Sequence, residues 1–249
     1  MCKEYKYVKP LIHCITNPIA MNQSANAVLA VGGRPMMAEH PKEVAEITET
    51  AGALLMNFGN ISDTRMEAML ISGAVAKEIG IPAVIDVCGV ACSRLRVDFF
   101  NKLIAVSAPR VIKGNYSEVL ALDDSSIRGS GIDAADNIMK DDVIEAAKRV
   151  ADRYQTMVLA TGPVDILATD NQVREIAGGC KQLGSVTGTG CMLGAIVATF
   201  LAMEDSADSV EKATRFFGEC GARAQTDKGG GTFMVNLLDR LGEYDGVKY

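Results

Sequence analysis

Short runs of consecutive apolar residues alternate with longer amphipathic segments along most of this chain. Continuous apolar runs of this length are typical of strands that are buried on both faces of a sheet. Four such strands are predicted, at residues 53–59, 82–89, 110–114 and 156–162. Because strands that alternate with helices form parallel sheets with right-handed crossovers, the pattern predicts an α/β fold.

Two of the amphipathic segments carry clear signals for where a helix begins and ends. Asn17 is predicted to cap a helix that has Pro18 in its first turn and ends near Gly32. Ser62 is predicted to cap a second helix, which stops at Gly80 because glycine adopts the left-handed conformation that commonly ends a helix.

The later part of the chain changes character. Residues 165–176 predict a β-hairpin that turns at Asp170 and Asn171. Residues 191–203, 209–227 and 232–241 are then expected to be helices. The stretch 123–137 suits a surface loop rather than a domain boundary. We therefore expect one domain over residues 1–249.

Composition excludes several classes of protein. Of 249 residues, 48% are hydrophobic and 22% are charged, which is typical of a globular chain and not of a disordered one. The net charge of −6 and the absence of tryptophan give no basis for binding nucleic acid or anionic membranes. No apolar run is long enough to span a bilayer, and the first residues hold no signal-peptide core. Seven scattered cysteines without a CxxC pair favour the reducing cytoplasm over a disulfide framework.

Polar residues follow each of the four predicted strands. In open α/β sheets ligands bind beyond the carboxyl ends of the strands, so several strands that deliver polar side chains to one edge predict a ligand cleft there. Taken singly, the same residues are ordinary helix caps and turn residues, and only the set favours a site. The set comprises Asn57, Asn60, Asp86, Lys113, Asn115, Glu118 and Thr161.

A glycine-rich turn, TGTGC at residues 187–191, leads into an apolar helix. Two glycines allow successive N–H groups to converge, and the helix N-terminus adds its unpaired N–H groups, so the turn predicts an anion hole for a phosphate. Without a GxxxxGK[ST] motif the turn is not a P-loop, and the chain has no Rossmann glycine pattern. The helix dipole is expected to lower the pKa of Cys191, which could act as a base, a nucleophile or a packing residue.

Two further motifs have competing interpretations. Asn115 and Glu118 start a short helix on one face, where they could hold Mg²⁺ through oxygen or form a capping box. Alone, capping is the better interpretation. Three glycines at residues 229–231 could wall an adenine pocket or form a flexible turn. Only two histidines are present, His13 and His40, which excludes a histidine-rich metal site.

Four segments together resemble the hydroxyethylthiazole kinase family of the ribokinase-like superfamily. The resemblance runs from about His13 to Leu241 and is carried by HCITNPIAMNQSANAVLAVGGRPMMAEHPKE, IKGNYSEV, TGPVDILATD and VTGTGCMLGAIVATFLA. The first and last segments are specific to this family, whereas the N-x-x-E pattern and the anion hole are shared across ribokinase-like kinases. The resemblance implies a mostly parallel central sheet with helices on both faces.

It also implies phosphorylation of the primary alcohol of 4-methyl-5-(2-hydroxyethyl)thiazole with ATP and Mg²⁺, as in thiamine salvage. Family positions that bind the thiazole correspond to Asn17, Met37 and Gly188, and the position of the base corresponds to Cys191. Positions that bind ATP correspond to Lys113, Thr161 and Gly190, and those that place Mg²⁺ correspond to Glu118, Asn115 and Asp86. The family is typically a homotrimer with thiazole sites at the subunit interfaces.

The chain departs from the family pattern at three places. Lys113 stands where the family usually has arginine, and lysine cannot form the bidentate fork that arginine forms with phosphate. Residues 86–91 read DVCGVA where the family has DPVGVG, and residues 179–181 lack the usual histidine.

These departures keep other functions open. A hydroxymethylpyrimidine or pyridoxal kinase and an ATP-dependent hydratase-repair enzyme would share the fold, although the segments of Asn17 and Met37 favour thiazole. A weakened protein that binds thiazole or nucleotide as a carrier or sensor is a second alternative. A cysteine-dependent hydrolase built on Cys191 is a third.

Overall fold

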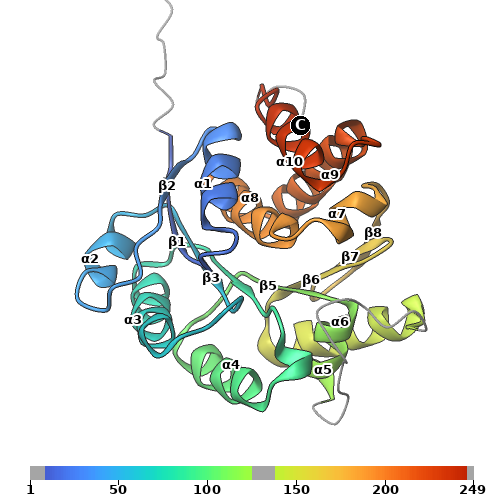
Figure 1. The fold of residues 1–249 in the computed structure, drawn as a ribbon. Coiled ribbons are helices and arrows are strands. Elements are labelled where there is room, and N and C mark those ends of the chain that lie inside the picture. Colours follow the sequence, from blue (N-terminus) through green and yellow to red (C-terminus); the bar gives the residue numbers. More distant parts are fainter. Residues whose placement is uncertain (1–8, 125–137, 246–249) are drawn as a thin grey trace, which may run out of the picture.

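A central sheet runs through the computed structural model, which describes residues 9–124 and 138–245 (Figure 1). Its strands are β1 Leu11–Ile15, β2 Arg34–Met36, β3 Ala53–Asn57, β4 Ala83–Asp86, β5 Val111–Asn115, β6 Met157–Thr161, β7 Asp165–Ala168 and β8 Val173–Ile176. They lie in the order β2-β1-β3-β4-β5-β6-β7-β8. Neighbours from β2 to β6 are parallel, and β6–β7 and β7–β8 are antiparallel, so the prediction of a mostly parallel sheet is confirmed.

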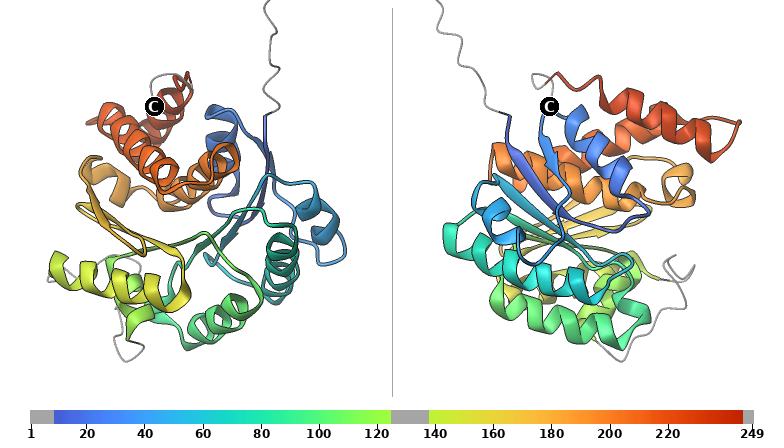
Figure 2. Two further views of the ribbon diagram at one scale, coloured as in Figure 1. Left: turned by 180° about the vertical axis from the view of Figure 1, so that it is seen from behind. Right: turned by 60° about the vertical axis from the view of Figure 1, so that its left-hand side comes forward.

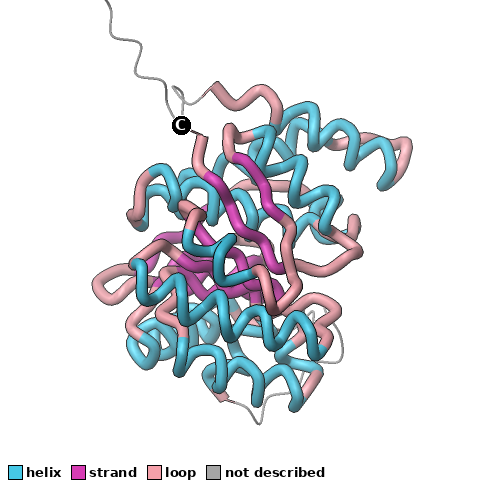
Figure 3. Tube along the Cα trace, turned by 90° about the vertical axis from the view of Figure 1, so that its left-hand side faces the viewer, coloured by secondary structure: helices cyan, strands magenta, loops and turns pink. Residues whose placement is uncertain are grey.

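Helices cover both faces of this sheet, as the back and side views in Figure 2 show. One layer holds α1 Met21–Ala30, α7 Lys181–Ser185, α8 Thr189–Met203, α9 Ala207–Ala224 and α10 Gly230–Leu241. The other holds α2 Val44–Glu49, α3 Asp63–Ile79, α4 Arg94–Val106, α5 Tyr116–Asp123, α6 Lys140–Tyr154 and the 3-10 turn η1 Val90–Cys92. Figure 3 shows the strands enclosed between the two layers. Over the described ranges, no helix has the length and hydropathy needed to cross a membrane.

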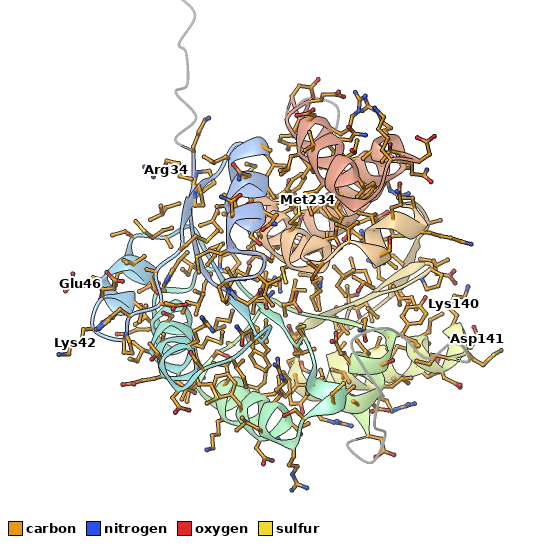
Figure 4. The ribbon with its side chains drawn as sticks, viewed as in Figure 1. Arg34, Lys42, Glu46, Lys140, Asp141 and Met234 are labelled. Carbon is orange, nitrogen blue, oxygen red and sulfur yellow. The ribbon has the colours of Figure 1, made fainter. Side chains whose placement is uncertain are left out.

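Each face of the sheet has its own cluster of buried apolar side chains. Leu55 of β3 belongs to the cluster under α8, whereas its neighbours Leu54 and Met56 belong to the cluster over α3 and α4. Successive strand side chains point to opposite faces, which explains why the central strands read as continuous apolar runs rather than alternating ones. Met234 of α10, labelled in Figure 4, packs against the first cluster.

The N-terminal helix begins later than the sequence predicts. Residues 18–20 form a turn, and α1 starts at Met21. Asn17 Oδ1 accepts a hydrogen bond from the backbone N–H of Ala20 at 3.1 Å. Asn17 therefore caps this turn rather than the helix, and its amide nitrogen is available for another contact. The predicted end near Gly32 is confirmed, since α1 ends at Ala30 and Gly32 has a φ of 90°.

The other predicted elements are confirmed with small shifts at their ends. Ser62 caps α3, and Gly80 ends it in the left-handed conformation with a φ of 75°. Strands β7 and β8 form the predicted antiparallel hairpin. The last three helices begin two residues earlier than predicted, at Thr189, Ala207 and Gly230. Apart from residues 123 and 124, the loop predicted at 123–137 lies outside the described residues.

Two strands have no counterpart among the predictions. Strand β1 contains His13, whose ring is buried. The ring Nδ1 lies 2.9 Å from Thr48 Oγ1, and Nε2 donates a hydrogen bond to the carbonyl of Ala38 at 3.0 Å. A histidine interrupts the apolar run, so the pattern of hydrophobicity alone does not mark a strand there. Strand β2 has three residues and lies at the edge of the sheet, where a periodic pattern is too short to read.

The register of the parallel strands aligns their polar carboxyl ends. Asn57 of β3 lies opposite Asp86 of β4, and Asp86 lies opposite Lys113 of β5. Further along the same edge, Asn115 lies opposite Thr161 of β6. The edge therefore carries a row of polar side chains on four adjacent strands, as the sequence predicts.

Candidate active site

A cleft of about 680 Å³ opens at this edge, between the strand ends and the N-terminus of α8. Nearly all of the site residues predicted from the sequence line it. They are Asn17, Asp86, Lys113, Asn115, Glu118, Thr161, Gly188, Gly190 and Cys191. These residues span most of the chain, and the sheet brings them together because parallel strands end at one edge.

Two predicted site residues are absent from the lining of this cleft: Asn57, which is fully buried at the end of β3, and Met37. Met37 follows β2 and is half-buried against the apolar cluster under α8. The three-glycine turn at residues 229–231 is also absent from the lining formed by the described residues. Within one chain, the structure thus separates Met37 from Asn17, the other side chain predicted to bind thiazole.

Cys191 lies in the first turn of α8 and is held by an asparagine pair. Asn17 Nδ2 donates to Cys191 Sγ at 3.3 Å and to Asn57 Oδ1 at 3.3 Å. Asn57 Oδ1 also accepts from the backbone N–H of Gly59 at 2.7 Å. The turn after β3 therefore fixes Asn57, and Asn57 holds the Asn17 amide against the sulfur.

Burial raises the pKa of the Cys191 thiol, and the Asp86 carboxylate raises it further. The nearby charge of Lys113 and the hydrogen bond from Asn17 lower this pKa without offsetting those two effects. The expectation that the helix dipole leaves Cys191 with a lowered pKa is therefore wrong. Desolvation is the largest cause of the raised pKa, because removing a thiolate from water is costly, and burial cannot be inferred from position in a helix.

Asp86 and Lys113 form a buried ion pair beside the thiol. Lys113 Nζ lies 2.9 Å from Asp86 Oδ2, and their side chains are 5% and 4% exposed. Burial alone lowers the pKa of Lys113, but the charge of Asp86 and its hydrogen bond raise it on balance. Lys113 therefore stays protonated in the interior.

Glu118 lines the cleft but is almost completely buried, and its carboxylate accepts hydrogen bonds from two backbone N–H groups. Its Oε1 accepts from the N–H of Gly89 at 2.7 Å, and its Oε2 accepts from the N–H of Asn115 at 2.7 Å. Asn115 Oδ1 in turn accepts from the N–H of Glu118 at 2.9 Å, which completes a capping box at the start of α5. Burial, followed by repulsion from Asp86, raises the pKa of Glu118 to about 7.

Asp86 and Glu118 are the carboxylates of the cleft that could bind a magnesium ion. Across the part of the chain that the structure describes, no three or more His, Cys, Asp or Glu residues gather in a way that would hold a metal by themselves. Mg²⁺ usually keeps several waters and binds through one or two carboxylates together with substrate phosphates. Asp86 and Glu118 fit that pattern, since they face one cleft and repel each other. Asn115 Oδ1 is engaged in the helix cap, which supports the capping interpretation of this residue.

The glycine-rich turn opens the N-terminus of α8 toward the cleft. Gly188 has a φ of 91°, which favours glycine, and it is the N-cap residue of α8. Thr189 Oγ1 lies 2.6 Å from the carbonyl oxygen of Leu183 and 3.0 Å from that of Val186, so its hydroxyl is turned to the backbone. A Cβ on Gly190 would lie 3.6 Å from Lys113 Nζ. The first N–H groups of α8 and the Lys113 cation therefore flank one space that suits an anion.

Thr161 ends β6 at the other side of the cleft. Its Oγ1 donates to the carbonyl of Gly114 at 3.3 Å, which ties the ends of β5 and β6 together. The neighbouring Asp165 is half-buried and accepts a hydrogen bond from the N–H of Gly162 at 3.0 Å, and desolvation raises its pKa to about 6.

Several lining residues were not singled out from the sequence. They include Ile19, Gly59, Cys88, Gly89, Cys92 and Arg96. Arg96 lies in the first turn of α4, and its Nη1 donates to the backbone carbonyls of Phe58 and Cys88. Nothing in the sequence around Arg96 distinguishes it from the neighbouring Arg94, because only the fold turns one toward the cleft and the other to solvent.

One family of known proteins matches nearly the whole chain. The family model described as the hydroxyethylthiazole kinase family matches residues 2–245. The chain is 45% identical to hydroxyethylthiazole kinase 2 of Clostridium botulinum (strain Hall) over 241 residues, which cover 95% of this chain and 91% of that protein.

Solved structures give the same result at the level of the fold. The hydroxyethylthiazole kinase protein of Pyrococcus horikoshii OT3 superposes with a TM-score of 0.84 at 30% identity, covering 94% of this chain and 88% of the other. A ribokinase-like superfamily protein of Enterococcus faecalis V583 has a TM-score of 0.68 at 13% identity, covering 94% and 87% of the two chains. The predicted ribokinase-like architecture is confirmed.

Proposed function

This chain belongs to the hydroxyethylthiazole kinase family, and we propose that its cleft transfers a phosphoryl group from ATP to the hydroxyl of 4-methyl-5-(2-hydroxyethyl)thiazole. The observation that carries the proposal is that three features lie next to one another in the cleft. A helix N-terminus faces the cleft, the half-buried thiol of Cys191 lies in its first turn, and a buried Lys113–Asp86 pair lies beside the thiol. The product would enter thiamine salvage.

Phosphoryl transfer needs positioning and charge stabilisation more than covalent chemistry, because the transition state is loose and its charge is spread over oxygens. The N–H groups of Thr189, Gly190 and Cys191 would receive the charge of the transferred group. Lys113, which also approaches Gly190, would add a fixed cation on the opposite side. Thr161 and Gly190 would contact the nucleotide.

Cys191 would orient the acceptor hydroxyl and take its proton as the oxygen attacks. Its raised pKa makes the thiol neutral in the empty cleft, so proton transfer would be late and would contribute modestly. Asn17 would hold the sulfur in place, and its position beside Cys191 suits contact with the thiazole ring as well.

Asp86 and Glu118 would hold the Mg²⁺ that accompanies ATP, directly or through water, and Asn115 would fix Glu118 through the capping box. When bound, that ion neutralises phosphate charge. Glu118 and Asp86 supply the oxygen ligands, and Lys113 balances the charge of Asp86 before the nucleotide arrives.

Three alternatives make different predictions. A kinase for hydroxymethylpyrimidine or pyridoxal would transfer phosphate to those alcohols instead of thiazole. A carrier or sensor would bind ligand without turnover. A cysteine–histidine hydrolase is disfavoured, since neither His13 nor His40 is among the described residues that line the cleft, and burial raises the pKa of Cys191.

The test is ADP release from Mg-ATP with hydroxyethylthiazole, beside hydroxymethylpyrimidine, pyridoxal and a control without acceptor. We expect release that depends on thiazole and a phosphorylated thiazole detected by mass. Equal release without acceptor, or transfer only to another alcohol, would contradict the proposal. Tight thiazole binding without any ADP would support the sensor instead.

We also propose a homotrimer in which Met37 reaches the thiazole site of a neighbouring copy. Its absence from the cleft of its own chain supports this, as do exposed apolar side chains on the turn before α1, on α1 and on the edge strand. Ile19 is 57%, Leu29 55% and Met36 40% exposed. Arg34 projects from the same edge in Figure 4. Light scattering of Met36→Asp should give a smaller particle than the native chain, and a monomeric native chain would refute the trimer.

The remaining expectations concern the chain as a whole. A single domain is supported by the one sheet that both helical layers share. A cytoplasmic location is supported by the cysteines, since Cys14, Cys88, Cys92, Cys180, Cys191 and Cys220 are all free in the described ranges. Such thiols persist in a reducing compartment.

A further inference from the structure

Two cations line the cleft among its described residues, Lys113 and Arg96, and their surroundings differ. Lys113 is already paired with Asp86 at 2.9 Å. Arg96 forms no ion pair with any carboxylate in the ranges 9–124 and 138–245. A half-buried guanidinium that faces a cleft without a counter-ion provides a positive charge that a ligand can neutralise.

The backbone fixes the orientation of Arg96. Its Nη1 donates to the carbonyl of Cys88 at 2.7 Å and to the carbonyl of Phe58. These two contacts join the loops that follow β3 and β4. They use one corner of the guanidinium and leave the edge formed by Nε and Nη2 without a partner among the described residues. That edge carries two parallel N–H groups, which is the geometry that binds two oxygens of a phosphate.

Gly89 brings this edge close to the carboxylate end of the cleft. A Cβ on Gly89 would lie 3.2 Å from Arg96 Cζ and Nε and 3.3 Å from Cδ, so Gly89 lies directly against the guanidinium end of this side chain. The N–H of the same residue donates to Glu118 Oε1 at 2.7 Å. The φ of 77° favours glycine at this position, and a side chain there would also crowd Arg96. Arg96 and Glu118 are thus positioned by opposite sides of one glycine turn.

We propose that Arg96 binds phosphate oxygens through its Nε–Nη2 edge and supplies the bidentate fork that Lys113 cannot form. The inference rests on the proposed kinase function, which places a nucleotide polyphosphate and a phosphorylated product in this cleft. Either could provide the oxygens. The polyphosphate is favoured because Arg96 lies over the turn that holds Glu118, where the phosphates of Mg-ATP would lie.

A merely structural Arg96 would behave differently. If its only role were to join the two loops, its loss would weaken all ligands of the cleft alike. If Arg96 binds phosphate, its loss should weaken the binding of ligands that carry phosphate groups and leave the binding of the others unchanged. The distinction is measurable by equilibrium binding and does not depend on turnover.

The experiment compares the native chain with Arg96→Gln, Arg96→Lys and the control Arg94→Gln. Arg94 lies on the same helix, its side chain is 78% exposed, and it pairs with Asp98. Calorimetry would measure the binding of ATP, ADP, AMP, adenosine, hydroxyethylthiazole and the thiazole phosphate.

We expect Arg96→Gln to weaken the binding of ATP and ADP by about 10²–10⁴-fold, as the loss of two charged hydrogen bonds implies, and to leave the binding of adenosine and hydroxyethylthiazole unchanged. Arg96→Lys should recover only part of the affinity, because a single ammonium forms no fork. Arg94→Gln should match the native chain. If Arg96→Gln weakened the binding of the thiazole phosphate but not that of ADP, the phosphate contact would be assigned to the product.

The proposal would be overturned if Arg96→Gln lowered the affinity for every ligand by the same factor, or if a folded Arg96→Gln protein bound ADP as tightly as the native chain. If the variants do not fold, the native chain can be treated with phenylglyoxal, and pyrophosphate should protect Arg96 but not Arg94 from modification. Modification of Arg96 at the same rate with saturating pyrophosphate would also overturn it. Native protein that binds ADP through Arg96 but transfers no phosphate to thiazole would refute the proposed function and leave this inference standing.

Discussion

The side-chain amide of Asn17 donates a hydrogen bond to the thiol of Cys191, with 3.3 Å between Nδ2 and Sγ. The two residues are 174 positions apart in the chain. Asn17 can make this contact because α1 starts only at Met21. The side-chain oxygen Oδ1 of Asn17 therefore caps the turn before the helix, and its nitrogen Nδ2 faces the thiol. The reactivity of the thiol therefore depends on the turn that precedes α1.

Replacing Cys191 by alanine should lower kcat by about 10²-fold, the lower end of the range for general-base catalysis, because a loose transition state needs little proton transfer. Thiazole binding should change little. Cys191→Asp should keep measurable activity if a carboxylate can take the proton. The control is Cys180→Ala, whose thiol donates to Gly221 away from the cleft. Full activity in Cys191→Ala would remove the cysteine from the mechanism.

Replacing Asn17 by alanine should make Cys191 react more slowly with iodoacetamide at a fixed pH. The amide hydrogen bond lowers the pKa of the thiol, so its loss leaves less thiolate. Alkylation of the Cys191 peptide would be followed by mass spectrometry, since Cys92 is exposed and reacts as well. Asn26→Ala on α1 is the matched control, since the Asn26 amide donates to Asn22 and is exposed. Faster alkylation in Asn17→Ala would contradict this account.

Replacing Lys113 by methionine should destabilise the fold by about 3–5 kcal/mol, because it leaves the Asp86 carboxylate buried and unpaired. The double variant Lys113→Met/Asp86→Leu should recover much of this loss, since both charges are then removed. Urea unfolding of the native chain, Lys113→Met, Asp86→Leu and the double variant measures the coupling. Lys148→Met breaks an exposed pair with Glu145 and should change the free energy of unfolding little. A double variant less stable than either single variant would contradict the expected coupling.

Asp165 should make stability depend on pH. Burial raises the pKa of Asp165 from 3.8 to about 6. The folded state therefore holds this proton more tightly, and the stabilisation present below pH 3.8 is lost as the pH rises through about 6. Asp165→Asn keeps an oxygen acceptor for Gly162 without the charge. Its stability relative to the native chain should rise by about 1–3 kcal/mol between pH 4 and pH 7.5.

Urea unfolding at several pH values provides the measurement. The same substitution at Asp170, an exposed residue of the hairpin turn, serves as the control for a generic change of charge. A difference between Asp165→Asn and the native chain that stays constant with pH would show that this carboxyl does not titrate in that window.

Local chemistry explains why much of the site could be predicted. Each central strand reads as an apolar run because both of its faces are buried, and each run ends in a polar residue at the edge of the sheet where the cleft opens. The turn at Gly188 and the cap at Ser62 depend on backbone preferences of single residues. Such features are encoded within a few positions, and the structure reproduces them.

Other features depend on what the folded chain removes from water. Cys191 is at a helix N-terminus, which lowers a pKa, yet burial and Asp86 raise it. Strand β1 carries a histidine that is acceptable only because Thr48 and Ala38 meet its ring in the fold. Neither effect can be derived from neighbouring residues, since both depend on segments distant in sequence.

By itself, then, the amino-acid sequence determined the alternation of buried strands and helices, the polar strand ends and the glycine-rich turn before α8, because these depend on short-range pattern and backbone conformation. Only the tertiary structure decided that Lys113 pairs with Asp86, that Asn17 binds Cys191, and that Arg96 turns toward the cleft while Arg94 turns to solvent. Those outcomes depend on strand register and on desolvation, which exist only once distant parts of the chain have packed together.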